Sequence, residues 1–259
     1  MKTVSPYGAI ASLPWSLALQ SILGCGLFCV GAANAELLIE SSRIVYPQGM
    51  REVSFRIQNL SAEKPALVQL WVDEAETDAG PENSVAPFIL SPPLVRLSAK
   101  GRQTVRLMYT GESQNPALES LYTLNLLEPP PAIKGSDDVD RVNFTVRSRM
   151  KIFFRPRGLK GNLEESMKQL QCKLVDMEGT PTLDCYNPSP FHLSFLGYKL
   201  GNALEKGPDS NFGMFLPRTR ANFALKDVDK LPRPLNTVAF NFINDIGATV
   251  PVEFALAAH

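Results

Sequence analysis

Hydrophobic and polar residues alternate along most of the chain from Glu36 onward, in short segments separated by turn-forming residues. Residues 52–58 (EVSFRIQ), for example, alternate cleanly and stop at Asn59-Leu60-Ser61. Successive side chains of a strand point to opposite faces of a sheet, so this alternation indicates strands with one buried face. The segments between them have no convincing helical period. The pattern therefore predicts an all-β protein.

The predicted strands fall into two groups, about seven in the first part of this region and six in the second. Between the groups, the segment RPRGLKGN contains Pro156, Gly158 and Gly161, which interrupt a strand ladder and loosen the chain. Such regular spacing favours antiparallel sandwiches of the immunoglobulin type, with a barrel as the alternative. We predict two immunoglobulin-like β-sandwich domains, residues 36–156 and 162–259, joined by a linker at 157–161. The strands are expected at 37–45, 52–58, 66–73, 88–90, 103–108, 121–127, 142–154, 170–175, 182–186, 192–200, 221–225, 238–243 and 250–257.

The first 35 residues differ in composition and predict a secretory signal peptide. Lys2 is their only charged residue, an apolar run extends from Trp15 to Gly31, and Ala33-Asn34-Ala35 is a small-x-small cleavage pattern. We expect cleavage after this pattern and export from the cytoplasm. An uncleaved anchor is one alternative. A lipoprotein signal at Cys25 is another, which is disfavoured because the apolar run continues past this cysteine.

Removal of the signal leaves two cysteines, Cys172 and Cys185, and an even pair in an exported protein indicates a disulfide. They lie on two predicted strands that face each other across a turn near Gly179. The bond would close a loop of about 13 residues and contribute roughly 3 kcal/mol. Two buried free thiols are the alternative. The two histidines, His192 and His259, have no cysteine or carboxylate at a recognisable metal-binding spacing, so we predict no metal site.

Charge and motifs argue against several classes of function, although acidic residues are numerous enough for a catalytic carboxylate pair and leave an enzyme on a sandwich scaffold as a third alternative. The chain has 259 residues with 26 basic and 26 acidic side chains, so it has no global attraction to nucleic acid or to anionic lipid. It contains no glycine-rich phosphate loop and no HExxH, GxSxG or CxxC motif. We predict a binding protein that is not an enzyme, with no cofactor, no nucleic-acid partner and no small-molecule substrate.

The segment 142–154 (VNFTVRSRMKIFF) predicts a strand that is unusually long and has a basic polar face. Its 13 residues would span about 43 Å, whereas sandwich strands usually have about 5 to 6 residues. One end should therefore extend beyond its own sandwich, exposing Val142, Phe144 and Val146. Such an edge suits strand addition to a partner. The alternative is an ordinary strand with a bulge near Ser148 and with Arg147 and Arg149 in solvent.

From Glu36 to its end the sequence resembles the family of periplasmic pilus-assembly chaperones of the PapD/FimC type. The matching stretches follow the family's order through both predicted domains: SRIVYP (42–47), SPPLVRL (91–97), ESLYTLNLLEPPP (119–131), KIFFRP (151–156), NPSPF (187–191) and FINDIGA (242–248). The resemblance implies two immunoglobulin-like domains in an L-shaped (boomerang) arrangement. It also implies a location in the periplasm of a Gram-negative bacterium.

The resemblance further implies roles for individual residues. Arg43 and Lys151 would bind the C-terminal carboxylate of a pilus subunit. The apolar side chains Val142, Phe144 and Val146 would complete the subunit's unfinished fold as a donor strand. A charged network of Glu119, Arg155 and Asp245 would hold the two domains at a fixed angle. The short loop 132–141 resembles the branch of the family that is associated with rod-like pili.

The implied function is a chaperone that folds and caps pilus (fimbrial) subunits without ATP and delivers them to an outer-membrane usher. A secreted structural or adhesive β-sandwich protein, or a fimbrial subunit, is the alternative. Two complete domains and the Arg43/Lys151 pair argue against a subunit. The sequence leaves open whether the free protein self-associates through its exposed strand, and it assigns no role to Arg147 and Arg149.

Overall fold

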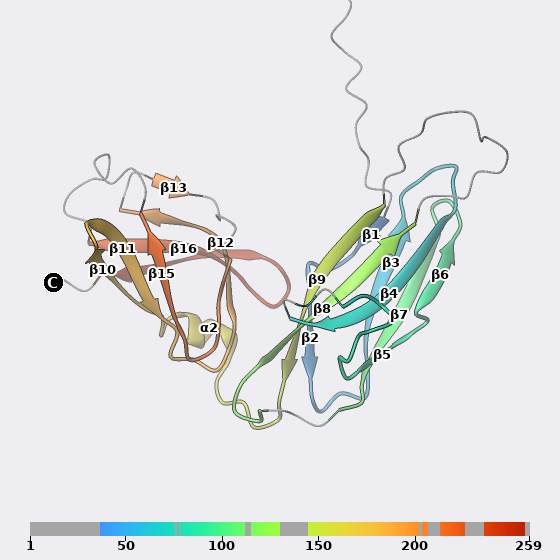
Figure 1. Ribbon diagram of the computed structural model, residues 1–259, viewed down its shortest axis with the longest axis horizontal. Helices are drawn as coiled ribbons and strands as arrows, with labels where there is room; N and C mark the ends of the chain where they lie inside the picture. Colours follow the sequence, from blue (N-terminus) through green and yellow to red (C-terminus); the bar gives the residue numbers. More distant parts are fainter. Residues whose placement is uncertain are drawn as a thin grey trace, which may run out of the picture. The chain divides into compact units, whose positions relative to one another are not determined.

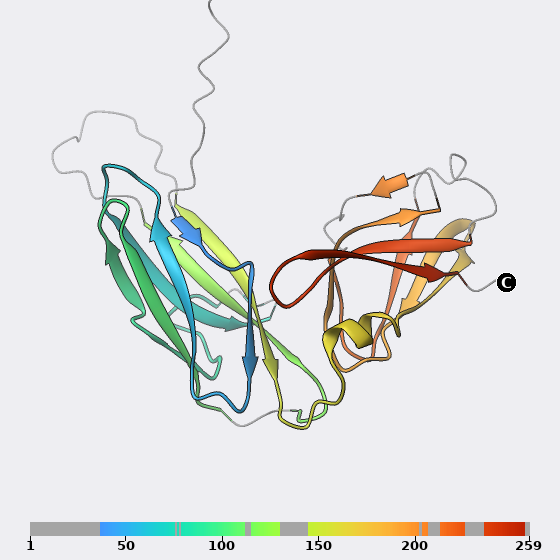
Figure 2. The same ribbon diagram turned by 180° about the vertical axis from the view of Figure 1, so that it is seen from behind.

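A computed structural model of the protein describes residues 37–75, 77, 79–111, 115–129, 145–201, 204–206, 213–225 and 236–256. Strands dominate this part of the chain, as the alternation predicts, and they form two sandwiches (Figures 1 and 2). The predicted signal peptide, Val142, Phe144 and the 132–141 loop lie outside the described residues.

The first sandwich packs a four-stranded sheet against a five-stranded sheet. Both sheets send alternate side chains into one core, in which Ile57, Val68, Val105, Leu124 and Ile152 are fully buried. The four-stranded sheet has the order β1 (Leu37–Ile39), β3 (Val53–Asn59), β7 (Arg102–Tyr109) and β5 (Phe88–Ser91). The five-stranded sheet has the order β2 (Arg43–Pro47), β9 (Val146–Arg155), β8 (Ser120–Glu128), β4 (Ala66–Glu74) and β6 (Leu94–Leu97).

The strand predicted at residues 37–45 is wrong, because these residues form two separate strands. β1 pairs with β3 in one sheet, and after a crossover at residues 40–42 the chain enters the other sheet as β2. Ser41 lies at the crossover, where its Oγ donates a hydrogen bond to the carbonyl oxygen of Arg43 at 2.5 Å. Alternation alone could not locate the crossover, since both halves have the same period of two.

The second sandwich has its own core, in which Met167, Leu183, Cys185, Leu193 and Val238 are fully buried. One sheet has the order β10 (Gln171–Met177), β11 (Thr180–Tyr186) and β15 (Arg220–Ala224). The other has the order β13 (Leu204–Lys206), β12 (Leu193–Leu200), β16 (Thr237–Ile243) and β17 (Thr249–Ala255), with β14 (Met214–Phe215) also pairing with β12. β6, β13 and β14 are short strands that the alternation did not reveal.

A short helix, α2 (Leu163–Met167), precedes this second sandwich and was not predicted. Asn162 caps it, because its side-chain oxygen accepts a hydrogen bond from the backbone N–H of Glu165 at 2.8 Å. Leu163 and Met167, four residues apart, pack into the core. Five residues are too few to establish a visible helical period in the sequence.

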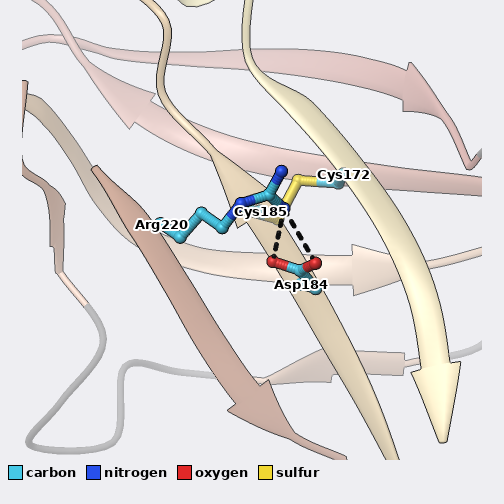
Figure 3. The surroundings of a disulfide bond; sticks show 4 residues. All are labelled: Cys172, Asp184, Cys185 and Arg220. Atoms are coloured by element: carbon cyan, nitrogen blue, oxygen red, sulfur yellow. Dashed lines mark hydrogen bonds and ion pairs between the residues drawn. A yellow bond between two sulfur atoms is a disulfide. The ribbon is translucent and has the colours of Figure 1, made fainter. Parts of the chain in front are cut away.

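The predicted disulfide between Cys172 and Cys185 is present. The two residues stand opposite each other in the β10–β11 hairpin, whose turn places Glu178 and Gly179 at φ of 53° and 79°. Positive φ at both central positions gives the twist that two-residue hairpins favour. On the other face of β11, Asp184 accepts hydrogen bonds from Arg220 at 2.9 and 3.2 Å (Figure 3).

Removing the disulfide should selectively destabilise the second sandwich. Closing a loop of 13 residues contributes roughly 3 kcal/mol, which for a domain of about 100 residues corresponds to about 10 °C or more in thermal midpoint. We expect a Cys172→Ala/Cys185→Ala variant to show such a fall in differential scanning calorimetry. The wild-type protein should show the same fall after reduction, and the reductant should not affect the variant. A wild-type midpoint that is insensitive to reductant would contradict this expectation.

Candidate functional site

Arg43 and Lys151 face each other on neighbouring strands, at the point where β2 begins. β2 and β9 run parallel, and Arg43 is paired in register with Lys151. In β9 the even-numbered residues Met150, Ile152 and Phe154 point into the core, so Lys151 projects from the outer face of the sheet. The parallel register thus brings together two cations that lie 108 residues apart in the sequence.

The Arg43 guanidinium is largely buried but only partly satisfied. Its Nη1 donates a hydrogen bond to the carbonyl oxygen of Ile243 at 3.2 Å, and the group lies 5.5 Å from the centroid of the Phe153 ring. Its Nε is buried and has no hydrogen-bond partner among the described residues. A buried donor without an acceptor is unfavourable, so an external acceptor bound here would be stabilised.

The Lys151 ammonium is also partly removed from solvent and lies beside a like charge. Burial lowers the pKa of Lys151, and the neighbouring charge of Arg43 lowers it further. Burial also lowers the pKa of Arg43, although the carboxylates of Asp245 and Glu119 act in the opposite direction. No carboxylate within the described part of the chain forms an ion pair with Lys151.

Two partly desolvated cations side by side fit an anion that is small enough to contact both. A carboxylate offers two oxygens, one for the guanidinium and one for the ammonium, in charge-assisted hydrogen bonds. The negative charge would also remove the repulsion between Arg43 and Lys151. The chemistry of the pair therefore suits a single carboxylate.

The edge of β9 beside this pair is open. Residues 151–155 of β9 pair with β2, whereas residues 146–150 pair only with β8 among the described strands. The open edge exists because the chain enters this sheet only at β2, after the 40–42 crossover, while the preceding strand β1 belongs to the other sheet. Val146 begins the edge, and half of its surface, 51%, is exposed. Unpaired backbone groups beside an exposed apolar side chain are the features that strand addition uses.

The three residues expected in a charged network are indeed in contact. Arg155 donates from Nε to Glu119 at 2.7 Å and from both terminal nitrogens to Asp245 at 2.7 Å. A fourth member, His192, was not predicted: its backbone N–H and ring Nδ1 both lie 2.9 Å from the same oxygen of the fully buried Glu119. A lone histidine with no motif around it gave no signal for this contact.

Other site types have little support in the part of the chain that the structure covers. No group of three or more histidine, cysteine or acidic side chains there is arranged to hold a metal ion. Helices long and apolar enough to cross a membrane are likewise absent from the described residues.

Comparison with known proteins identifies the family. Residues 36–160 match the N-terminal domain, and residues 165–254 the C-terminal domain, of the pili and flagellar-assembly chaperone PapD. The chain is 30% identical to the chaperone protein FimB/FhaD of Bordetella pertussis, over 87% of this chain and 90% of that protein. It is 32% identical to the chaperone protein HifB of Haemophilus influenzae, over 85% and 88%. The crystal structure of the YadV chaperone superposes with a TM-score of 0.69 and 28% identity, covering 85% of this chain and all of the other.

The chain therefore belongs to the PapD family of pilus-assembly chaperones. This confirms the resemblance seen in the sequence, and with it the all-β fold of two immunoglobulin-like domains.

The free protein should be more stable without the charge of Lys151. Because burial lowers its pKa, the folded state holds this proton less tightly than the unfolded chain does. The charged lysine thus destabilises the folded protein at neutral pH, and this effect fades as the pH rises through the lowered pKa toward the ordinary value of about 10.4. We expect Lys151→Met to raise the thermal midpoint at pH 7, by an amount that shrinks at pH 10. A lower midpoint for the variant at pH 7 would show that the ammonium is satisfied in the free protein.

Proposed function

We propose that this protein is a periplasmic chaperone that captures pilus subunits, completes their fold with its own segment 142–150 and delivers them to an outer-membrane usher. The donor residues are Val142, Phe144 and Val146, and the carboxylate anchor is Arg43 with Lys151. Its two domains are residues 36–156 and 162–259, which the linker 157–161 connects. The protein acts by binding, with no enzymatic step and no cofactor.

The observation that carries this proposal is the position of the cationic pair at one end of the open edge. A strand added beside residues 146–150 fills the place that β2 leaves vacant before Arg43. If this strand ends with its carboxylate at Lys151, it must run in the same direction as β9. Backbone hydrogen bonds then supply affinity along the edge, while the carboxylate fixes the register because a chain has only one C-terminus.

The charged network has a supporting part in this proposal. Arg155 lies at the end of β9, and its partners Glu119 and Asp245 come from segments far apart in the sequence. Buried ionic networks often contribute little net stability but select one geometry. We assign this network, with His192, to holding the two domains in the orientation that subunit binding requires.

The periplasmic location rests on two arguments. The first 35 residues have the composition of a signal peptide. The disulfide between Cys172 and Cys185 also belongs in an oxidising compartment. The alternative of a secreted adhesive protein or a fimbrial subunit is disfavoured, because the curated relatives that cover most of the chain are chaperones.

Co-purification from periplasmic extract tests the carboxylate anchor. Wild-type protein with an affinity tag should retain a pilus subunit. Arg43→Ala and Lys151→Ala should each reduce the retained subunit by more than about tenfold, because each leaves a buried charge of the complex without its partner. Val146→Asp should also reduce capture, with little change in thermal midpoint because this side chain is half exposed.

Arg106→Ala is the matched control for the loss of a cation, since Arg106 is an exposed residue of β7 in the other sheet. It should retain the subunit as the wild type does. Normal yields of subunit with both Arg43→Ala and Lys151→Ala would refute the anchor.

A further inference from the structure

A buried carboxylate lies on the outer face of the five-stranded sheet, away from the sandwich core. Asp73 of β4 is fully buried, and its Oδ2 accepts hydrogen bonds from Trp71 Nε1 at 2.9 Å and from Asn125 Nδ2 at 3.0 Å. Asn125 belongs to β8 and is itself fully buried. Burying a charge is costly unless it is paired, so this carboxylate requires a cation.

Arg147 of β9 supplies that cation and joins the three strands. Its Nη2 lies 3.3 Å from Asp73 Oδ2, and its Nε and Nη2 donate to Asn125 Oδ1 at 3.1 and 2.9 Å. The guanidinium also lies 4.8 Å from the centroid of the Trp71 ring. A planar group with several donors can make these contacts together, which an ammonium cannot. We call Trp71, Asp73, Asn125 and Arg147 the outer-face cluster.

The cluster lies at the part of β9 that is held least by backbone pairing. The β8–β9 ladder ends at the pair Glu128 and Val146, and Arg147 is the next residue along β9. The opposite edge of residues 146–150 has no partner among the described strands. Arg149 adds a weaker link on the same face, since its Nη2 donates to the carbonyl oxygen of Thr77 at 3.1 Å. Side chains thus help to hold a segment that has one backbone ladder, whereas residues 151–155 of the same strand have two.

We propose that Arg147 is a positioning residue for subunit capture, which holds the open edge of β9 extended and in register before a subunit arrives. This inference rests on the proposed function. A partner that adds a strand must order both chains, and an edge already held in the bound conformation reduces that entropic cost. Buried ion pairs add little net stability but specify geometry, which matches a role in positioning.

Arg147→Lys is the variant that separates positioning from charge. It keeps a cation beside Asp73 but cannot contact Asp73 and Asn125 with the same planar group. The probe is the pilus subunit that co-purifies with the wild type, unfolded in denaturant and diluted into chaperone. We expect its capture to slow about five- to tenfold, the size of effect of one lost hydrogen bond. Hydrogen–deuterium exchange at residues 146–150 of the free protein should accelerate, while exchange in β3 and β7 stays unchanged.

Arg56→Lys is the matched control. Arg56 lies on β3 in the other sheet and donates hydrogen bonds to both carboxylate oxygens of Glu40 at 3.2 Å. Its replacement by lysine should leave both the capture rate and the hydrogen–deuterium exchange unaltered. If Arg147→Lys folds poorly, the double variant Asp73→Asn/Arg147→Gln removes both charges and should show the same slow capture.

Wild-type capture rates for Arg147→Lys and for the double variant would overturn the inference. So would faster exchange spread equally over β3, β7 and β9, because that result would indicate a loss of global stability. Failure of the proposed function would look different from failure of this inference, since the wild-type protein itself would then capture no subunit.

Discussion

Arg43 and Lys151 place two positive charges side by side, and much of the first sandwich can be understood from this constraint. Parallel pairing of β2 with β9 forces the two residues together. Burial and mutual repulsion lower the pKa of Lys151, and Arg43 retains a buried nitrogen that has no hydrogen-bond partner in the described part of the chain. A protein selected for stability alone would replace such a pair. In the proposed function, the carboxylate of a subunit offsets the cost of this pair, as functional sites often sacrifice stability.

The crossover at residues 40–42 explains why that partner can be a strand. Because the chain moves from β1 in one sheet to β2 in the other, β9 keeps an open edge that begins at Val146 and ends beside the cations. An open edge is normally a hazard for aggregation. Here the outer-face cluster and the Arg149 contact hold it from the side, and the Arg155 network secures its far end. One strand thus carries Lys151 of the proposed anchor, the edge at residues 146–150 and the Arg155 contact with Asp245 of the second sandwich.

The alternation of hydrophobic and polar residues alone predicted most of the longer strands, because a strand with one buried face must alternate apolar and polar side chains. The pairing of Cys172 with Cys185 was also accessible, since their spacing places both on one hairpin. The crossover between β1 and β2 and the short helix α2 were missed: the first preserves the alternation and the second is too short to have a period. Arg43 and Lys151 were predicted as site residues only through the family resemblance, because the sequence alone does not distinguish an arginine in solvent from one that lies beside a lysine on the next strand. The roles of His192 and Arg147 depend on contacts between residues 73 and 74 positions apart, which no local pattern reveals.

The central claim is that the chain end of a subunit lies between Arg43 and Lys151, and zero-length cross-linking of the complex measures this most directly. A carbodiimide joins a carboxylate to an amine only when the two are in contact, so a cross-link at Lys151 reports the position of the subunit's chain end. Mass spectrometry of the digested product should find the subunit's last residue joined to Lys151. A terminal residue joined instead to a distant lysine such as Lys64 or Lys100, with Lys151 unmodified, would contradict the account.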